Sequence, residues 1–233
     1  MLEFYHCTSD IFLDSIKKNG LGKINPNFDL NLLELLSYVH RIANENLPNN
    51  ETLKNLDFTT QLMINQEIRK VDKEIYNVDI LNFKHDGLFL SLGDLAAITH
   101  SHYNKYGSEI LNRIMQIIKV LSDNGIGFTI PKTIDKLNIL SLINKTPKPV
   151  FIKIKNLDYN FLFNDRDIPM GIMMAKIEKE LKTTSEKVLF HFKQTTVFKY
   201  IKTVDQENFE AFYLEYDGHP IDSNFEYYLS SVK

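Results

Sequence analysis

The chain has 233 residues, 43% of them hydrophobic, so it can bury one sizeable core, and we expect a single domain over 1–233. Its net charge of -3 argues against a uniformly basic, nucleic-acid-binding surface, and its single cysteine, Cys7, excludes an internal disulfide and a thiolate-rich zinc cluster. Because it has neither a run of about 18 apolar residues for a membrane span nor a secretory signal, we predict a cytoplasmic protein with no membrane contact and no metal.

The first third of the chain is predicted to begin with a strand and to continue as helices. Alternating aromatic residues over 2–8 predict the strand, and the helix after it is expected to end at Asn19-Gly20. Apolar residues recur at helical spacing over 24–82, with a break at Pro48, so this segment is predicted to be helical.

The rest of the chain mixes both kinds of element. A strand is expected over 88–91, followed by a helix that begins at Gly93-Asp94 and runs through Tyr103. A strongly amphipathic helix is expected over 109–121. The last third is predicted to contain one Met-rich helix, 168–181, and three alternating strands, 150–155, 188–193 and 211–216. Strands at both ends with helices between them indicate an α+β fold.

The opening Phe4-Tyr5-His6-Cys7-Thr8-Ser9, followed by a helix and the turn Asn19-Gly20-Leu21, resembles the first motif of the ADP-ribosyltransferase superfamily. In the members with a His-aromatic-Glu site, such as the poly-ADP-ribose polymerases and bacterial toxins, a strand ending in Tyr-His-Gly-Thr precedes a short helix. The resemblance implies that His6 hydrogen-bonds the adenosine ribose of NAD. It also implies that the backbone at Cys7 and Thr8 holds the nicotinamide carboxamide.

A second stretch, Gly87-Leu88-Phe89-Leu90-Ser91 and the helix after it, is similar to the central strand and helix of that family. The resemblance implies that Phe89, Ser91, Tyr103 and Tyr106 line the NAD site. One aromatic ring would stack on nicotinamide, since a cationic ring is attracted to an aromatic face. The sequence leaves open whether this ring belongs to Phe89, Tyr103 or Tyr106.

The third match is Glu186-Lys187-Val188-Leu189, which is similar to the late strand of the family that begins with the catalytic glutamate. Cleavage of the bond between nicotinamide and ribose builds positive charge on the ribose, and a nearby carboxylate stabilises that charge. The resemblance therefore implies that Glu186 is the catalytic residue.

Together the three motifs predict a core of two small packed sheets with flanking helices, enlarged by a helical insertion at about 24–82. The implied activity is transfer of ADP-ribose from NAD, used as a substrate, to RNA, DNA or protein. A bacterial or phage-linked toxin or antiviral defence effector, with a possible antitoxin protein, fits such a unit. The alternatives are an RNA 2'-phosphotransferase of the same fold and a non-catalytic module that binds a partner protein.

Each candidate residue also has a purely structural interpretation. His6 is alternatively a hydrogen-bonded core histidine, and Glu186 is alternatively an exposed charge at a strand entrance. Tyr103 and Tyr106 are alternatively packing residues on one edge of a helix. Cys7 is not expected to act with His6, because neighbours on a strand point to opposite faces.

Overall fold

The computed structural model describes residues 2–76, 79–164, 166–222 and 224–232. Within them the chain divides into two compact units. The first, here called the sheet unit, comprises Met1–Ile24, Gly87–Gly107 and Pro147–Lys233. The second, the helical unit, comprises Asn25–Asp86 and Ser108–Thr146. The mixture of helices and strands confirms the α+β class.

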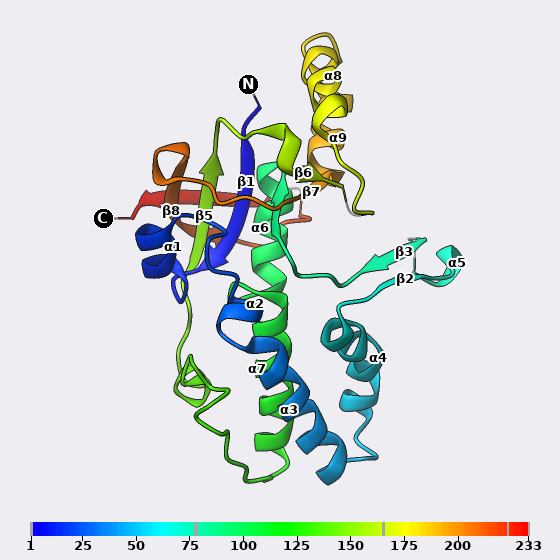
Figure 1. The fold of residues 1–233 in the computed structure, drawn as a ribbon, viewed down its shortest axis with the longest axis vertical. Coiled ribbons are helices and arrows are strands. Elements are labelled where there is room, and N and C mark those ends of the chain that lie inside the picture. The colour runs from blue at the N-terminus through cyan, green and yellow to red at the C-terminus, as the bar shows by residue number, and fades with distance from the viewer. Residues whose placement is uncertain (1, 77–78, 165, 223, 233) are drawn as a thin grey trace. The chain divides into compact units, whose positions relative to one another are not determined.

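The sheet unit contains one antiparallel sheet of seven strands among its described residues, in the order β6-β7-β4-β1-β5-β8-β9. Strand β1 lies in the middle, between β4 and β5 (Figure 1). The strands, in chain order, are β1 (Phe4–Ser9), β4 (Leu88–Ser91), β5 (Pro149–Ile154), β6 (Leu162–Phe163), β7 (Val197–Tyr200), β8 (Phe209–Asp217) and β9 (Glu226–Ser231). The expectation of two small packed sheets was wrong for this unit, because backbone pairing joins all seven strands.

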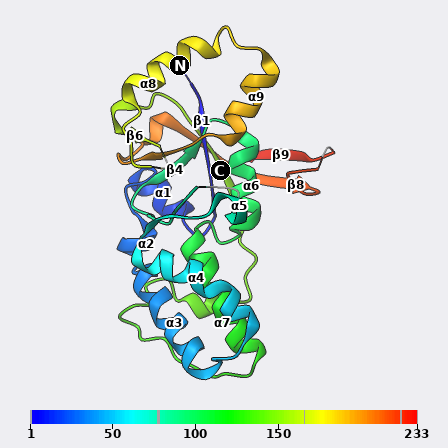
Figure 2. The same cartoon turned by 90° about the vertical axis from the view of Figure 1, so that its right-hand side faces the viewer.

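The helices of the sheet unit are α1 (Leu13–Asn19), α6 (Asp94–Tyr103), α8 (Gly171–Leu181) and α9 (Glu186–Thr195), with 3-10 turns η2 (Tyr159–Phe161) and η3 (Gln206–Asn208). Helix α6 covers one face of the sheet, where Ala97 and Ile98 pack on Cys7, Phe151 and Leu214. Helices α8 and α9 project beyond the sheet (Figures 1 and 2).

The strand expected over 188–193 was wrong, since these residues lie in α9. Their alternating apolar pattern also fits helical spacing, because the half-buried side chains are Leu189, Phe192 and Lys193. Val188 and Phe190, the other apolar residues of the stretch, are exposed. The helical periodicity thus prevailed over the alternating one.

The helical unit is built around three long helices, α3 (Leu32–Asn46), α4 (Glu51–Asn65) and α7 (Glu109–Asp123), which contact one another (Figure 2). Its shorter elements are α2 (Pro26–Asp29), β2 (Ile68–Lys70), α5 (Lys73–Tyr76), β3 (Ile80–Asn82) and η1 (Ile139–Leu142). The segment 24–82 is therefore mostly helical, but the β2-β3 hairpin corrects the expectation that it is helical throughout.

The amphipathic stretch that includes 109–121 forms α7, the central helix of this unit. Its apolar face is buried, including Ile110, Leu111, Ile114, Ile117, Ile118 and Leu121. On the side toward α4, the guanidinium of Arg113 donates to the Leu56 carbonyl at 2.9 Å and to the hydroxyls of Thr59 and Thr60 at 2.9 and 2.6 Å. Burial lowers the pKa of Arg113, which still carries its charge and ties the two helices together.

Candidate functional site

The imidazole of His6 joins the first two sequence motifs. Strands β1 and β4 pair at Tyr5 and Ser91, and the ring of His6 reaches across to β4 next to that pair. Its Nδ1 lies 2.9 Å from the carbonyl oxygen of Phe89. A carbonyl oxygen can only accept a hydrogen bond, so Nδ1 carries the proton and donates it. Two motifs that are 83 residues apart are thus held together at the centre of the sheet.

His6 is uncharged at neutral pH. Burial among the surrounding protein atoms lowers its pKa from 6.5 to about 4, although the hydrogen bond to the Phe89 carbonyl opposes this shift; nearby His100 lowers the pKa further. Because Nδ1 holds the one proton of the neutral ring, Nε2 presents a lone pair. Such a nitrogen can accept a hydrogen bond from a hydroxyl group, for example one on a ribose.

The other motif side chains on β1 and β4 are engaged in packing and in local hydrogen bonds. The Cys7 side chain is 2% exposed, and burial raises the pKa of its thiol, so it is not an activated nucleophile. The Thr8 hydroxyl donates to the Gly107 carbonyl at 3.1 Å, and the Ser91 hydroxyl donates to the Gly93 carbonyl at 2.8 Å. The Cys7 side chain is therefore buried, and the hydroxyls of Thr8 and Ser91 are occupied within the protein.

The two tyrosines after β4 lie in different surroundings. Tyr103 is the last residue of α6 and is 55% exposed, with its hydroxyl 3.2 Å from Nε2 of His219. Tyr106 follows the helix, and its carbonyl accepts a hydrogen bond of 3.0 Å from the Ser9 hydroxyl. Of the three aromatic candidates, Phe89 is the one whose backbone contacts His6.

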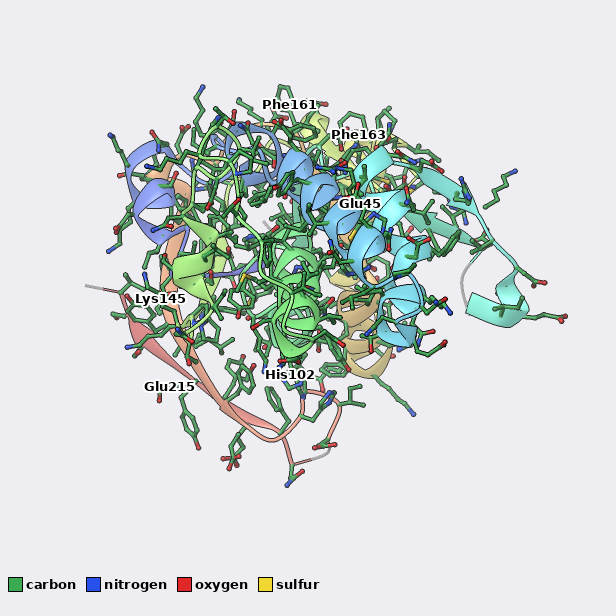
Figure 3. The ribbon with its side chains drawn as sticks, turned by 90° about the horizontal axis from the view of Figure 1, so that it is seen from below. Glu45, His102, Lys145, Phe161, Phe163 and Glu215 are labelled. Atoms are coloured by element: carbon green, nitrogen blue, oxygen red, sulfur yellow. The ribbon has the colours of Figure 1, made fainter. Side chains whose placement is uncertain are left out.

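Tyr103 belongs to an aromatic cluster that the sequence did not predict. The rings of His102 and His219 meet at 4.5 Å between centroids, and the ring of Tyr216 lies 5.8 Å from that of His102. Figure 3 labels His102. Burial, His219 and Lys105 lower the pKa of His102. His219 lies 116 residues beyond Tyr103, and nothing in its local sequence signals the contact.

Glu186 is the first residue of α9 and is exposed. Within the described chain no hydrogen bond or ion pair links it to His6. The opposite end of α9 is held by Gln194, whose Oε1 accepts from the Ala96 backbone N–H at 2.9 Å and whose Nε2 donates to Asp94 Oδ1 at 3.1 Å. Glu186 lies eight residues before Gln194, or about 12 Å along a helix. The contacts of α9 with the first two motifs are thus made near Gln194, and no described hydrogen bond or ion pair joins Glu186 to them.

Asp94, a carboxylate that is not among the predicted site residues, lies at the start of α6. Its Oδ2 accepts a hydrogen bond of 2.6 Å from the hydroxyl of Tyr227, on β9. Burial would raise the pKa of Asp94, but the hydrogen bonds from Tyr227, Gln194 and the Leu95 backbone hold it below its usual value. Asp94 is therefore ionised and serves to tie α6, α9 and β9 together.

This arrangement predicts that Gln194→Ala releases α9. The substitution removes both hydrogen bonds to α6, which corresponds to about 1 to 2 kcal/mol of local stability. We expect the amides of α9 to exchange with deuterium faster, while those of β1 and β5 keep their rates.

Thr195→Ala is the matched control for that experiment, because the Thr195 hydroxyl donates to carbonyls within α9. Equal α9 exchange rates in Gln194→Ala and Thr195→Ala would show that Gln194 does not hold the helix.

Comparisons with known proteins identify no relative. No family model, no curated protein and no solved structure matches this chain. In the described part of the chain, no three or more His, Cys, Asp or Glu side chains are grouped as a metal site would need. None of the helices seen there has the length and apolar character to cross a membrane.

Proposed function

We propose that this chain binds NAD beside His6 and transfers its ADP-ribose group to a macromolecular acceptor. The observation that carries the proposal is the hydrogen bond between His6 and the Phe89 carbonyl. It joins the two motifs that resemble the NAD-binding motifs of ADP-ribosyltransferases, at the middle of one sheet.

The state of His6 suits the role that the resemblance gives it. With its pKa near 4 the ring is neutral, and with Nδ1 donating to the strand, Nε2 is the acceptor. In the proposed complex this nitrogen accepts a hydrogen bond from a hydroxyl of the adenosine ribose.

In the proposal, the carboxylate of Glu186 stabilises the positive charge that develops on the nicotinamide ribose. Nicotinamide leaves as a neutral molecule and needs no proton, so the acid has only to stabilise charge and hold a ribose hydroxyl. Glu186 is exposed in the first turn of α9, and the proposal requires its carboxylate to face the nicotinamide ribose when NAD binds.

The test measures the release of nicotinamide from NAD by chromatography. We expect the wild type to release it, His6→Ala to release it at least tenfold more slowly, and Glu186→Gln about a hundredfold more slowly. Glu180→Gln, at an exposed glutamate on α8, is the matched control and should keep the wild-type rate.

Two results would overturn the proposal. One is a wild-type protein that neither consumes NAD nor gains thermal stability from it. The other is an equal rate for Glu180→Gln and Glu186→Gln, which would remove Glu186 from the reaction. If turnover is seen, mass spectrometry of RNA, DNA and protein from expressing cells identifies the acceptor. Growth arrest that Glu186→Gln relieves would support a toxin.

A second candidate is a non-catalytic module that binds a partner protein. The observation in its favour is the exposed apolar surface of the two projecting helices, where Ile172 on α8 is 82% exposed and Val188 and Phe190 on α9 are 58% and 57% exposed. A contiguous exposed apolar patch marks a protein interaction site, and these helices supply exposed apolar side chains for one. A pure binding module should release no nicotinamide, so the same assay separates the two candidates.

A further inference from the structure

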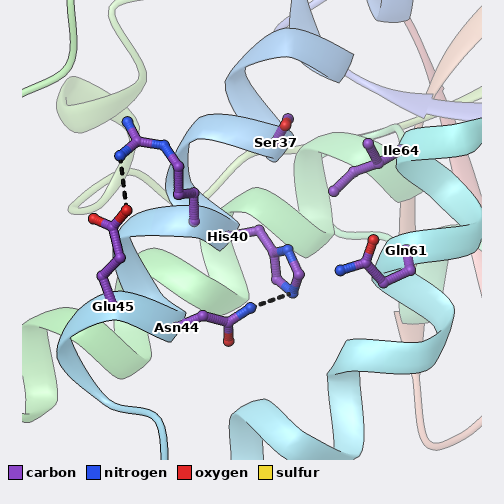
Figure 4. Close-up of a pocket in the computed structure, with 7 residues that line it drawn as sticks. Ser37, His40, Asn44, Glu45, Gln61 and Ile64 are labelled. Carbon is purple, nitrogen blue, oxygen red and sulfur yellow. Dashed lines mark hydrogen bonds and ion pairs between the residues drawn. The ribbon is translucent and has the colours of Figure 1, made fainter.

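A pocket of about 440 Å³ opens on the helical unit between α3 and α4, and none of the sequence motifs includes it. Its volume lies in the range of roughly 300 to 1,000 Å³ that small-molecule sites occupy. Ser37, His40 and Asn44 line it from α3, and Gln61 and Ile64 line it from α4 (Figure 4).

His40 forms the base of this pocket and is held by the opposite helix. The residue is 6% exposed, and its Nε2 lies 2.8 Å from Oδ1 of Asp57 on α4. The Asn44 side chain reaches the same nitrogen at 3.2 Å (Figure 4). A carboxylate only accepts, so Nε2 carries a proton and donates it to Asp57. This hydrogen bond fixes the ring of His40 between the two helices.

The amides of Asn44 and Gln61 supply hydrogen-bonding groups to the pocket. Each amide carries a donor and an acceptor in one plane, and in Figure 4 the Gln61 amide points across the pocket toward His40. Ile64 adds an apolar surface beside them. The edges of nucleobases carry adjacent donors and acceptors, and Asn and Gln amides pair with them through two hydrogen bonds.

The charges around the pocket disfavour an anionic ligand. The cation on its wall, Arg41, forms an ion pair of 3.0 Å with Glu45. Asp57 adds a negative charge behind His40. A phosphate would therefore meet two carboxylates and a guanidinium that is already paired.

The geometry points to a binding site for a neutral nucleoside, recognised through its base by the amides of Asn44 and Gln61 beside His40. This site is separate from the proposed NAD site and does not depend on ADP-ribosyl transfer. The base edge pairs with the two amides, and its ring lies against Ile64.

The test is a titration of the ¹⁵N-labelled full-length protein with adenosine, cytidine and uridine, in which NMR records the chemical shifts of the backbone amides. We expect saturable shifts confined to α3 and α4 for at least one nucleoside, with a Kd on the order of 1 mM. Ribose alone should cause none, and adenosine monophosphate should bind no more tightly than adenosine.

Gln61→Ala is the diagnostic variant, because Gln61 is exposed and its loss should not unfold the helix. Removing its hydrogen bonds should weaken binding about three- to tenfold. Lys54→Ala, another exposed position on α4, is the matched control and should bind as the wild type does.

The inference is overturned if no nucleoside gives saturable shifts at α3 and α4, or if Gln61→Ala and Lys54→Ala bind equally well. It is also overturned if ribose binds as well as the nucleosides, or if the monophosphate binds much more tightly than adenosine. The last result would identify a phosphate site.

Discussion

Alanine in place of Gly107 should lower the free energy of unfolding of the sheet unit by about 3 kcal/mol. Two effects add here. Gly107 has φ of +80°, a conformation that costs a residue with a side chain roughly 1 to 2 kcal/mol. In addition, a Cβ atom would lie 2.4 Å from the Ser9 backbone nitrogen and 2.7 Å from the Thr8 hydroxyl oxygen. Backbone in the central strand cannot move aside cheaply, so the contact adds its own cost.

Gly218→Ala is the matched control, and urea unfolding monitored by circular dichroism is the measurement. Gly218 has nearly the same φ, +81°, but the nearest atom to its Cβ would be Asp222 Oδ2 at 3.9 Å. Gly218→Ala should therefore lower the free energy of unfolding only by the cost of the backbone conformation, about 1 kcal/mol. Equal losses for the two variants would contradict the close approach of the connection after α6 to β1.

The Gly107 variant also has a functional consequence. Thr8 and Ser9 donate hydrogen bonds to the carbonyls of Gly107 and Tyr106, and these bonds hold the end of β1. Displacing that end moves the strand that carries His6. If the proposed NAD site lies there, Gly107→Ala should reduce nicotinamide release even under conditions where the variant is folded.

The second large effect is a loss of stability in acid that is caused by His6. Its pKa is about 4 in the folded protein and 6.5 in the unfolded chain, a difference of about 2.5, or roughly 3 kcal/mol. Above pH 6.5 the ring is neutral in both the folded and the unfolded chain, so the protein loses no stability from His6. As the pH falls from 6.5 to 4, the unfolded chain binds a proton that the folded chain does not bind, so stability decreases. Below about pH 4 both states are protonated and this contribution levels off.

This effect is isolated by comparing wild type with His6→Asn, whose amide can still donate to the Phe89 carbonyl. Urea unfolding at several pH values between 7 and 4 should show a steeper loss for the wild type, by roughly 3 kcal/mol over the window. Carboxylates that titrate in the same range are common to both proteins and cancel in the comparison. Parallel pH profiles would show that His6 is not held neutral in the folded state.

Most elements of the fold follow from local patterns in the sequence. The strands expected near 2–8, 88–91, 150–155 and 211–216 are confirmed as β1, β4, β5 and β8. The helices after Gly93, over 109–121 and over 168–181 are confirmed as α6, α7 and α8. Each of these has a single dominant periodicity. The stretch 188–193 fits both periodicities, and the strand interpretation was wrong.

The candidate site was predictable only in part. Local sequence placed His6 on a strand followed by a helix, and Phe89 on a second such strand. Their hydrogen bond, and the neutral state of His6 that results from burial, depend on the pairing of segments 83 residues apart. The tie between Asp94 and Tyr227 spans 133 residues, and no spacing rule connects such distant positions.

The amino-acid sequence alone determined where apolar and polar side chains alternate, and hence which segments extend and which coil, because these preferences act between neighbours along the chain. Tertiary structure decided which strands pair in the seven-stranded sheet, that burial lowers the pKa of His6, and that Glu186 lies exposed at the start of a helix. Those properties depend on burial and on contacts between remote segments, which exist only after the chain has folded.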